Sequence, residues 1–192
     1  MFIPAIGVYA VIPWGPNMAI ADLNIGLLYF VALSSLTTIV VFMAGWSSNN
    51  KYSLLGAMRV VAMMISYEVP VVVALLGVSL FTGSLSIGGI VEWQRDHHVW
   101  LVFLQPMAFF VYYIAATAEL NRTPADIAEA ESEIVAGYHT EYSGMKFSLF
   151  YAAEYTNALA LSALVASLYF GGWYMFGLEQ WIPGWFILLG KT

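Results

Sequence analysis

The sequence predicts an all-α integral membrane protein, a polytopic helical bundle with about five to six transmembrane segments. Three observations support this class. Hydrophobic residues make up 61% of the 192 residues, and the mean hydropathy is +0.78, whereas soluble domains are roughly 45–50% apolar. Apolar runs long enough to span a bilayer recur along the chain. The 7 Trp and 12 Tyr suit the membrane interfaces. Residues 1–192 are therefore predicted to form a single membrane domain.

The predicted segments follow one another along the chain, separated by polar or Gly- and Pro-rich connections. They are Phe2–Ile12, about Leu23–Ala44, about Leu54–Leu80, Trp100–Ala118, about Met145–Phe170 and the stub Trp185–Leu189. The run Pro13-Trp14-Gly15-Pro16 ends the first segment, and Phe81–Val99 is predicted to be a loop. The first segment extends only about 17 Å as a helix, too short for a bilayer. The last is shorter still, so we predict a domain truncated at both ends; the alternative is that the two end segments are re-entrant or interfacial half-helices.

Composition argues against several classes of function. A net charge of −6 and a pI near 4.8 do not suit nucleic-acid binding, which requires a basic surface. The chain has no cysteine, so it cannot itself hold a disulfide or a thiolate-bound iron–sulfur cluster. His97 and His98 are adjacent and His139 is distant, which is poor spacing for a metal site. We expect no metal site, and no cofactor bound by this chain alone.

The basic residues indicate an orientation in the membrane. Four of them lie in or beside connections on one side: Lys51, Arg59, Arg122 and Lys146. Arg95 lies in a connection on the other side. Because cytoplasmic loops carry an excess of Lys and Arg, we expect residues 119–144 to form an acidic loop on the cytoplasmic side.

The stretch 119–154 holds seven of the 12 acidic residues. Within it, Thr123-Pro124-Ala125-Asp126 is typical of a helix start, with a capping Thr and Pro at the first position, and Gly137 is a typical end. Asp126, Glu129 and Glu133 would share one face of this short helix. Two interpretations remain open: a proton or cation site, or a solvated acidic loop helix.

Two glutamates, one of them at the end of this stretch, lie inside predicted spans, where a charge is costly. Glu68 is in the middle of an apolar segment, two residues before Pro70, which removes a backbone donor. A carboxyl that gains and loses a proton there would suit a proton relay; the alternative is a neutral structural hydrogen bond. Glu154 and Asn157 would form a polar face directed into the bundle; the alternative is an interfacial Glu reaching water.

Three blocks of sequence resemble a known family: AGWSSNNKYSLLGAMR, then SYEVP, then AELNRTPADIAEAESEIVAGYHTEYSGMKFSLFYAAEYTN. In order and spacing they are similar to the signatures of the H subunit of bacterial respiratory complex I, the NADH:quinone oxidoreductase. Its mitochondrial counterpart is NADH dehydrogenase subunit 1. The resemblance runs from Pro4 to Thr192. It implies an eight-helix fold from which the first helix, the following amphipathic helix and the last two helices are missing here.

The resemblance also implies roles for individual residues. Asp126 and Arg122 match family positions near the quinone headgroup, although Pro124-Ala125-Asp126 departs from the usual PFD. Glu68 matches an intramembrane glutamate on the path from the quinone cavity to the proton pumps. Four residues match the acidic funnel below that cavity: Glu119, Glu129, Glu131 and Glu154.

The implied function is that of a membrane subunit of a proton-pumping enzyme in the bacterial inner membrane, with quinone as substrate. The redox centres would lie in other subunits, so this chain would not be catalytic alone. The implied partners are the quinone-site and terminal iron–sulfur subunits of the peripheral arm, adjacent small membrane subunits and lipid. Two alternatives are a membrane subunit of an energy-converting hydrogenase of the formate hydrogenlyase type, and a stand-alone proton or cation transporter.

Overall fold

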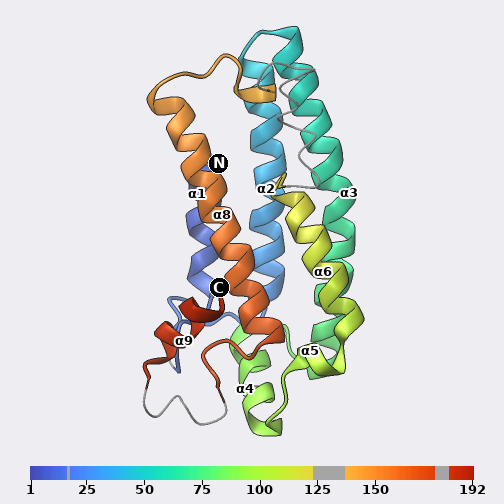
Figure 1. Ribbon diagram of the computed structural model, residues 1–192, viewed down its shortest axis with the longest axis vertical. Helices are drawn as coiled ribbons and strands as arrows, with labels where there is room; N and C mark the ends of the chain where they lie inside the picture. The colour runs from blue at the N-terminus through green and yellow to red at the C-terminus, as the bar shows by residue number, and fades with distance from the viewer. Residues whose placement is uncertain (17, 123–136, 176–181) are drawn as a thin grey trace.

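The computed structural model describes residues 1–16, 18–122, 137–175 and 182–192, and all regular structure within them is helical (Figure 1). Among these residues, three helices are long and apolar enough to cross a membrane: α2 (Gly26–Ser47), α3 (Lys51–Thr82) and α8 (Met145–Tyr169). They correspond to the predicted second, third and fifth segments. The prediction of an all-helical membrane protein is thereby confirmed.

Helices α2 and α3 form a close antiparallel hairpin. The turn between them is short because Asn50 caps α3, its side chain accepting a hydrogen bond from the backbone N–H of Tyr52 at 3.0 Å. Near the turn, a Cβ on Gly45 would lie 2.2 Å from the Cβ of Ala57. Glycine is therefore what allows the two helices to approach. Helix α3 continues through Pro70 to Thr82.

The predicted fourth span, Trp100–Ala118, is divided into α5 (Leu101–Leu104) and α6 (Pro106–Glu119). The break falls at Gln105, whose φ of −131° and ψ of 58° lie outside the helical region. Proline disfavours a helical conformation in the residue before it, so Pro106 starts a new helix. The Gln105 amide donates to the carbonyl of Gly77 at 3.2 Å, which fixes the break against α3.

The prediction of a loop over Phe81–Val99 was wrong, because α4 (Ile87–His97) occupies most of it. Ser86 caps this helix by accepting a hydrogen bond from the N–H of Gly89 at 3.3 Å. Ile90, Val91 and Gln94 are buried on one face. The amide of Gln94 donates to the carbonyl of Leu168 at 3.0 Å. The two glycines near the start of the helix hid this amphipathic pattern in the sequence.

Short helices at the two ends of the chain pack against α8. At the start, α1 (Phe2–Gly7) continues into η1 (Val8–Val11), and the Tyr9 hydroxyl donates to the Thr156 carbonyl at 2.7 Å. The predicted stub is α9 (Gly184–Lys191). Its Lys191 ammonium donates to three carbonyls just beyond the end of α8: Phe170 at 2.8 Å, Gly172 at 2.9 Å and Tyr174 at 2.6 Å. This cation thus satisfies carbonyls at a helix C-terminus.

Buried apolar side chains form two main clusters along the bundle. The larger joins α2, α3, α4, α6 and α8, with Phe30, Leu75 and Tyr112 fully buried. A smaller cluster near the α2–α3 turn includes Val41 and Met64. The polar residues of the candidate functional site lie around the smaller cluster, on the helices that join it to the larger one.

Candidate functional site

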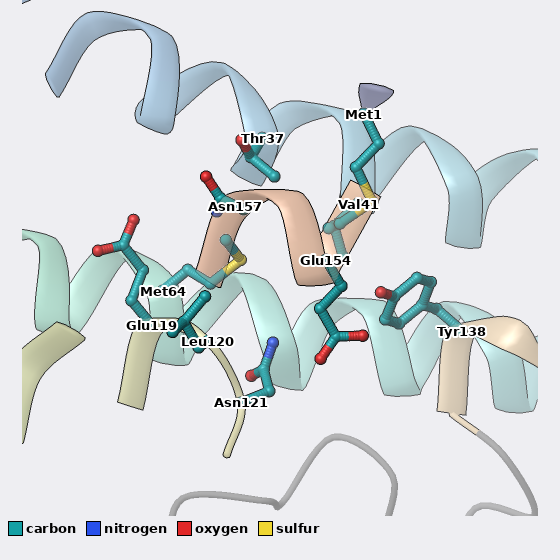
Figure 2. A pocket seen from close by; sticks show the side chains of 10 residues that line it. All are labelled: Met1, Thr37, Val41, Met64, Glu119, Leu120, Asn121, Tyr138, Glu154 and Asn157. Atoms are coloured by element: carbon teal, nitrogen blue, oxygen red, sulfur yellow. The ribbon is translucent and has the colours of Figure 1, made fainter. Parts of the chain in front are cut away.

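A small cavity lies among α2, α3, α6, α8 and the short 3-10 helix η2 (Gly137–His139) (Figure 2). Its volume is about 20 Å³, enough for one water molecule. The lining residues are Met1, Thr37, Val41, Met64, Glu119, Leu120, Asn121, Tyr138, Glu154 and Asn157. The cavity therefore combines apolar walls with two carboxyl groups and two amides.

The two cavity glutamates enter from different helices, as Figure 2 shows. Glu119 is the last residue of α6 and only 6% exposed. Glu154, on α8, has a side chain that is 17% exposed, and Asn157 lies about one turn further along α8 and is buried. The predicted polar face of Glu154 and Asn157 is thus directed into the bundle. Both glutamates line one cavity, and Figure 2 shows their carboxyl groups at opposite ends of it. Burying a carboxyl group is costly, which makes this cavity a candidate functional site.

Arg122 lies beside this group of polar residues. Its Nε is 4.0 Å from Oε1 of Glu154, and its guanidinium carbon is 4.8 Å from the centre of the Tyr155 ring. The Arg122 side chain is 45% exposed, so water screens the ion pair and its contribution to stability is small. The sequence placed Arg122 and Glu154 in separate groups, whereas the structure makes them neighbours.

Glu68 has a hydrogen-bond partner on the neighbouring long helix. The Ser35 hydroxyl of α2 donates to Oε1 of Glu68 on α3. Glu68 does not line the cavity, but it lies on α3, which packs directly against α6, the helix that ends at Glu119. The structure therefore brings three predicted proton-path residues, Glu68, Glu119 and Glu154, onto adjoining helices. The remaining predicted site residues lie outside the described residues. They are Asp126, Glu129 and Glu131, and the predicted short acidic helix lies in the same stretch.

The segment around η2 makes long-range contacts that the sequence did not reveal. Tyr138 lines the cavity, and its carbonyl accepts a hydrogen bond from the Ser53 hydroxyl at 3.2 Å. Two further bonds reach the α2–α3 turn, where the Tyr142 hydroxyl donates to a carbonyl at 2.8 Å and Glu141 accepts from an amide at 2.6 Å. These bonds join residues 85 to 98 positions apart, so local sequence could not predict them. Together they dock this segment onto the α2–α3 turn.

His139 is buried in an aromatic environment beside the cavity. Its ring lies 5.4 Å from the Phe150 ring and 5.7 Å from the Tyr151 ring, centre to centre. Within the described part of the chain, its Nδ1 is buried without a hydrogen-bond partner. Burial lowers the pKa of His139 to about 4, because the charged ring would lose its hydration.

This burial predicts that stability falls in mild acid. An unfolded histidine has a pKa of about 6.5, so between that pH and about 4 the unfolded state binds the proton and the folded state does not. Stability should decrease as pH falls through this window, by up to about 1.4 kcal/mol per pH unit. The midpoint of thermal unfolding, measured against pH, should lose part of this slope in His139→Gln. An identical slope in the variant would contradict the assignment.

Among the described residues, no three His, Asp or Glu side chains group together in a way that could hold a metal ion. The adjacent histidines of the sequence have other contacts. His97 Nδ1 lies 2.9 Å from the Trp93 carbonyl, and His98 Nδ1 lies 2.7 Å from the Tyr174 hydroxyl.

The fold and the site define an integral membrane protein whose long helices enclose an acidic internal cavity. The chain belongs to the NADH dehydrogenase family, whose profile matches residues 1–192. The resemblance carried by the three sequence blocks is thereby confirmed.

Several relatives are named as the H subunit of NADH-quinone oxidoreductase. The one from Dehalococcoides mccartyi (strain CBDB1) is 58% identical over 172 residues, covering 90% of this chain and 48% of the relative. The one from Geobacillus sp. (strain WCH70) is 53% identical over 189 residues, covering 97% and 56%. The one from Carboxydothermus hydrogenoformans is 53% identical over 177 residues, covering 92% and 50%. The chain thus spans about half the length of these relatives.

Proposed function

We propose that this chain serves in a proton-pumping NADH:quinone oxidoreductase, where it forms part of the quinone chamber and of the acidic path that couples quinone reduction to proton translocation. The observation that carries the proposal is that Glu119 and Glu154 line one cavity, with Glu68 on the adjoining helix α3. The names and identities of the relatives support the same enzyme.

The coupling would begin with a change of charge at the quinone. Two electrons make the quinone anionic until two protons follow to complete the quinol, and protons drawn from neighbouring groups would leave those groups more negative. The charge beside Arg122 and Asp126, the residues assigned to the quinone side, would change in either step. Arg122 is 4.0 Å from Glu154, so any shift of its guanidinium changes the field at that carboxyl. Carboxyl groups that interact across one cavity titrate together rather than one by one. A proton gained or lost at Glu154 would therefore alter the occupancy of Glu119.

Glu68 would pass the change in proton occupancy of Glu119 further along the membrane. It lies on α3, which packs against α6, the helix that carries Glu119. Two neighbouring carboxylates repel each other, so a proton lost from one would favour protonation of the other. Glu129 and Glu131, matched to the same acidic funnel by sequence, would contribute on the loop side. In this scheme the carboxyl groups exchange protons with one another and with water, and no bond to carbon is made or broken on this chain.

The electrons would reach the quinone from other subunits. The chain has no cysteine and hence no thiolate ligand for an iron–sulfur cluster. We therefore propose as partners the iron–sulfur and quinone-site subunits of a peripheral arm, and small membrane subunits beside the lipid-facing helices. Four basic residues lie in or beside the two connections on the side of residues 119–144, against Arg95 on the other side. This difference supports a cytoplasmic position for that stretch, in a bacterial inner membrane.

Purification of the intact complex through a tag on the chromosomal copy of this subunit tests the proposal. We expect co-purified iron–sulfur subunits, a flavin-containing NADH-oxidising subunit, and quinone reduction upon addition of NADH. A complex that contains nickel and evolves hydrogen would overturn the proposal in favour of a hydrogenase. Proton or cation transport by the purified chain alone would overturn it in favour of a transporter.

A further inference from the structure

Helix α2 carries a run of hydroxyl residues in the middle of an otherwise apolar span: Ser34, Ser35, Thr37 and Thr38. A hydroxyl in such a helix normally bonds to the carbonyl of the preceding turn. Ser34 follows this rule, donating to the Val31 carbonyl at 2.9 Å. Ser35 is different, because its single hydroxyl proton has two acceptors within reach: the Val31 carbonyl of its own helix at 3.0 Å and Oε1 of Glu68 on α3.

The position of Ser35 relates Glu68 to the acidic cavity. Two residues further along α2, Thr37 lines that cavity together with Glu119 and Asn157. Because residues two apart on a helix point to different faces, α2 contacts Glu68 with Ser35 on one face and borders the cavity with Thr37 on another. Ser35 and Glu68 are both half-buried, where few water molecules compete for the carboxyl oxygen. A carboxyl held in this way keeps a fixed direction, whereas an unheld glutamate rotates freely about its side-chain bonds.

We propose that Ser35 is a positioning residue of the proton path, which holds the Glu68 carboxyl against α2 on the helix that borders the cavity of Glu119 and Glu154. The inference rests on the proposed function of Glu68. It adds Ser35 to the proton path, a residue that is not acidic and that the pattern of acidic residues in the sequence therefore could not reveal. In this role Ser35 does not itself relay the transported proton. Its effect is to keep Glu68 in the orientation from which exchange with its neighbours is fast.

The test uses the assembled enzyme in inverted membrane vesicles, with the substitutions made in the chromosomal gene. Ser35→Ala is expected to lower NADH-driven quinone reduction and proton uptake about tenfold, the size expected for loss of a hydrogen bond to a charged group. Ser34→Ala is the matched control, because it removes a neighbouring buried hydroxyl that bonds within its own helix. It should behave as the wild type. Ser35→Thr keeps the hydroxyl and should restore both activities.

Three results would overturn the inference: wild-type coupling in Ser35→Ala, an equal loss in Ser34→Ala, or a Ser35→Ala complex that does not assemble. Each of these results would mean that Ser35 serves only packing or has no role.

Glu68→Gln, measured in the same vesicles, distinguishes an error in the role of Ser35 from an error in the proposed function. If Glu68→Gln pumps normally, the proton path itself is wrong. If it is inactive while Ser35→Ala is normal, only the role of Ser35 is wrong.

Discussion

Glu119→Gln is expected to slow quinone reduction about a hundredfold, within the range of a single acid–base group, in a complex that assembles normally. Glutamine has nearly the shape of glutamate and retains hydrogen bonding, but it cannot carry a proton. Glu119 is only 6% exposed, so bulk water does not reach it to carry the proton in its place. Native gel electrophoresis would measure assembly, and NADH-driven quinone reduction by membranes would measure the rate.

Glu141→Gln is the matched control for this prediction. Glu141 is exposed and bonds to Asn50 at the α2–α3 turn, and it does not line the cavity. Its substitution should leave the rate close to that of the wild type, because its carboxyl lies in water and outside the path. An equal loss in both variants would mean that acidic charge in general, and not the cavity, sets the rate.

Gly56→Ala is expected to disrupt the site through the fold. A Cβ at this position would lie 2.9 Å from the Cα and from the carbonyl carbon of Gly137. The opposing atoms are backbone, so no side chain can rotate away, and the segment that carries Tyr138 must move. Overpacking of this kind costs about 1–3 kcal/mol. We expect a lower unfolding temperature of the purified complex and faster loss of quinone reduction on heating.

Gly190→Ala provides the comparison, because nothing lies within 4 Å of a Cβ built there. Helix α9 should accept alanine without loss, since alanine favours a helix over glycine. If Gly56→Ala unfolded at the same temperature as Gly190→Ala, the η2 segment would not be docked on α3 as the structure has it.

Hydropathy predicted the long spans well because each is a nearly continuous apolar run. The ends of α2, α3 and α8 lie within a few residues of the predicted limits. Hydropathy predicted two shorter elements less well. Pro106 divides the predicted fourth span because it disfavours a helical conformation at Gln105. Helix α4 was missed because Gly88 and Gly89 lower its apparent helical propensity, whereas Ser86 and the buried Gln94 stabilise it through contacts.

For the site, the sequence predicted the residue types and not their arrangement. Intramembrane carboxyl groups such as Glu68 stand out because charge in an apolar span is costly. Which of them meet depends on helix packing: Ser35 and Glu68 are 33 positions apart in the sequence. The pairing of Arg122 with Glu154 likewise joins a turn after α6 to α8, a contact that no local pattern encodes.

We propose that buried carboxyl groups on adjoining helices couple quinone reduction to proton movement. We would measure proton uptake and quinone reduction together in inverted vesicles that contain Glu119→Gln. Among the described residues, Glu119 is the most buried carboxyl of the proposed path. We predict that both rates fall together, about a hundredfold, while the amount of assembled complex is unchanged. Normal proton uptake at a normal rate of quinone reduction in this variant would contradict the proposed coupling.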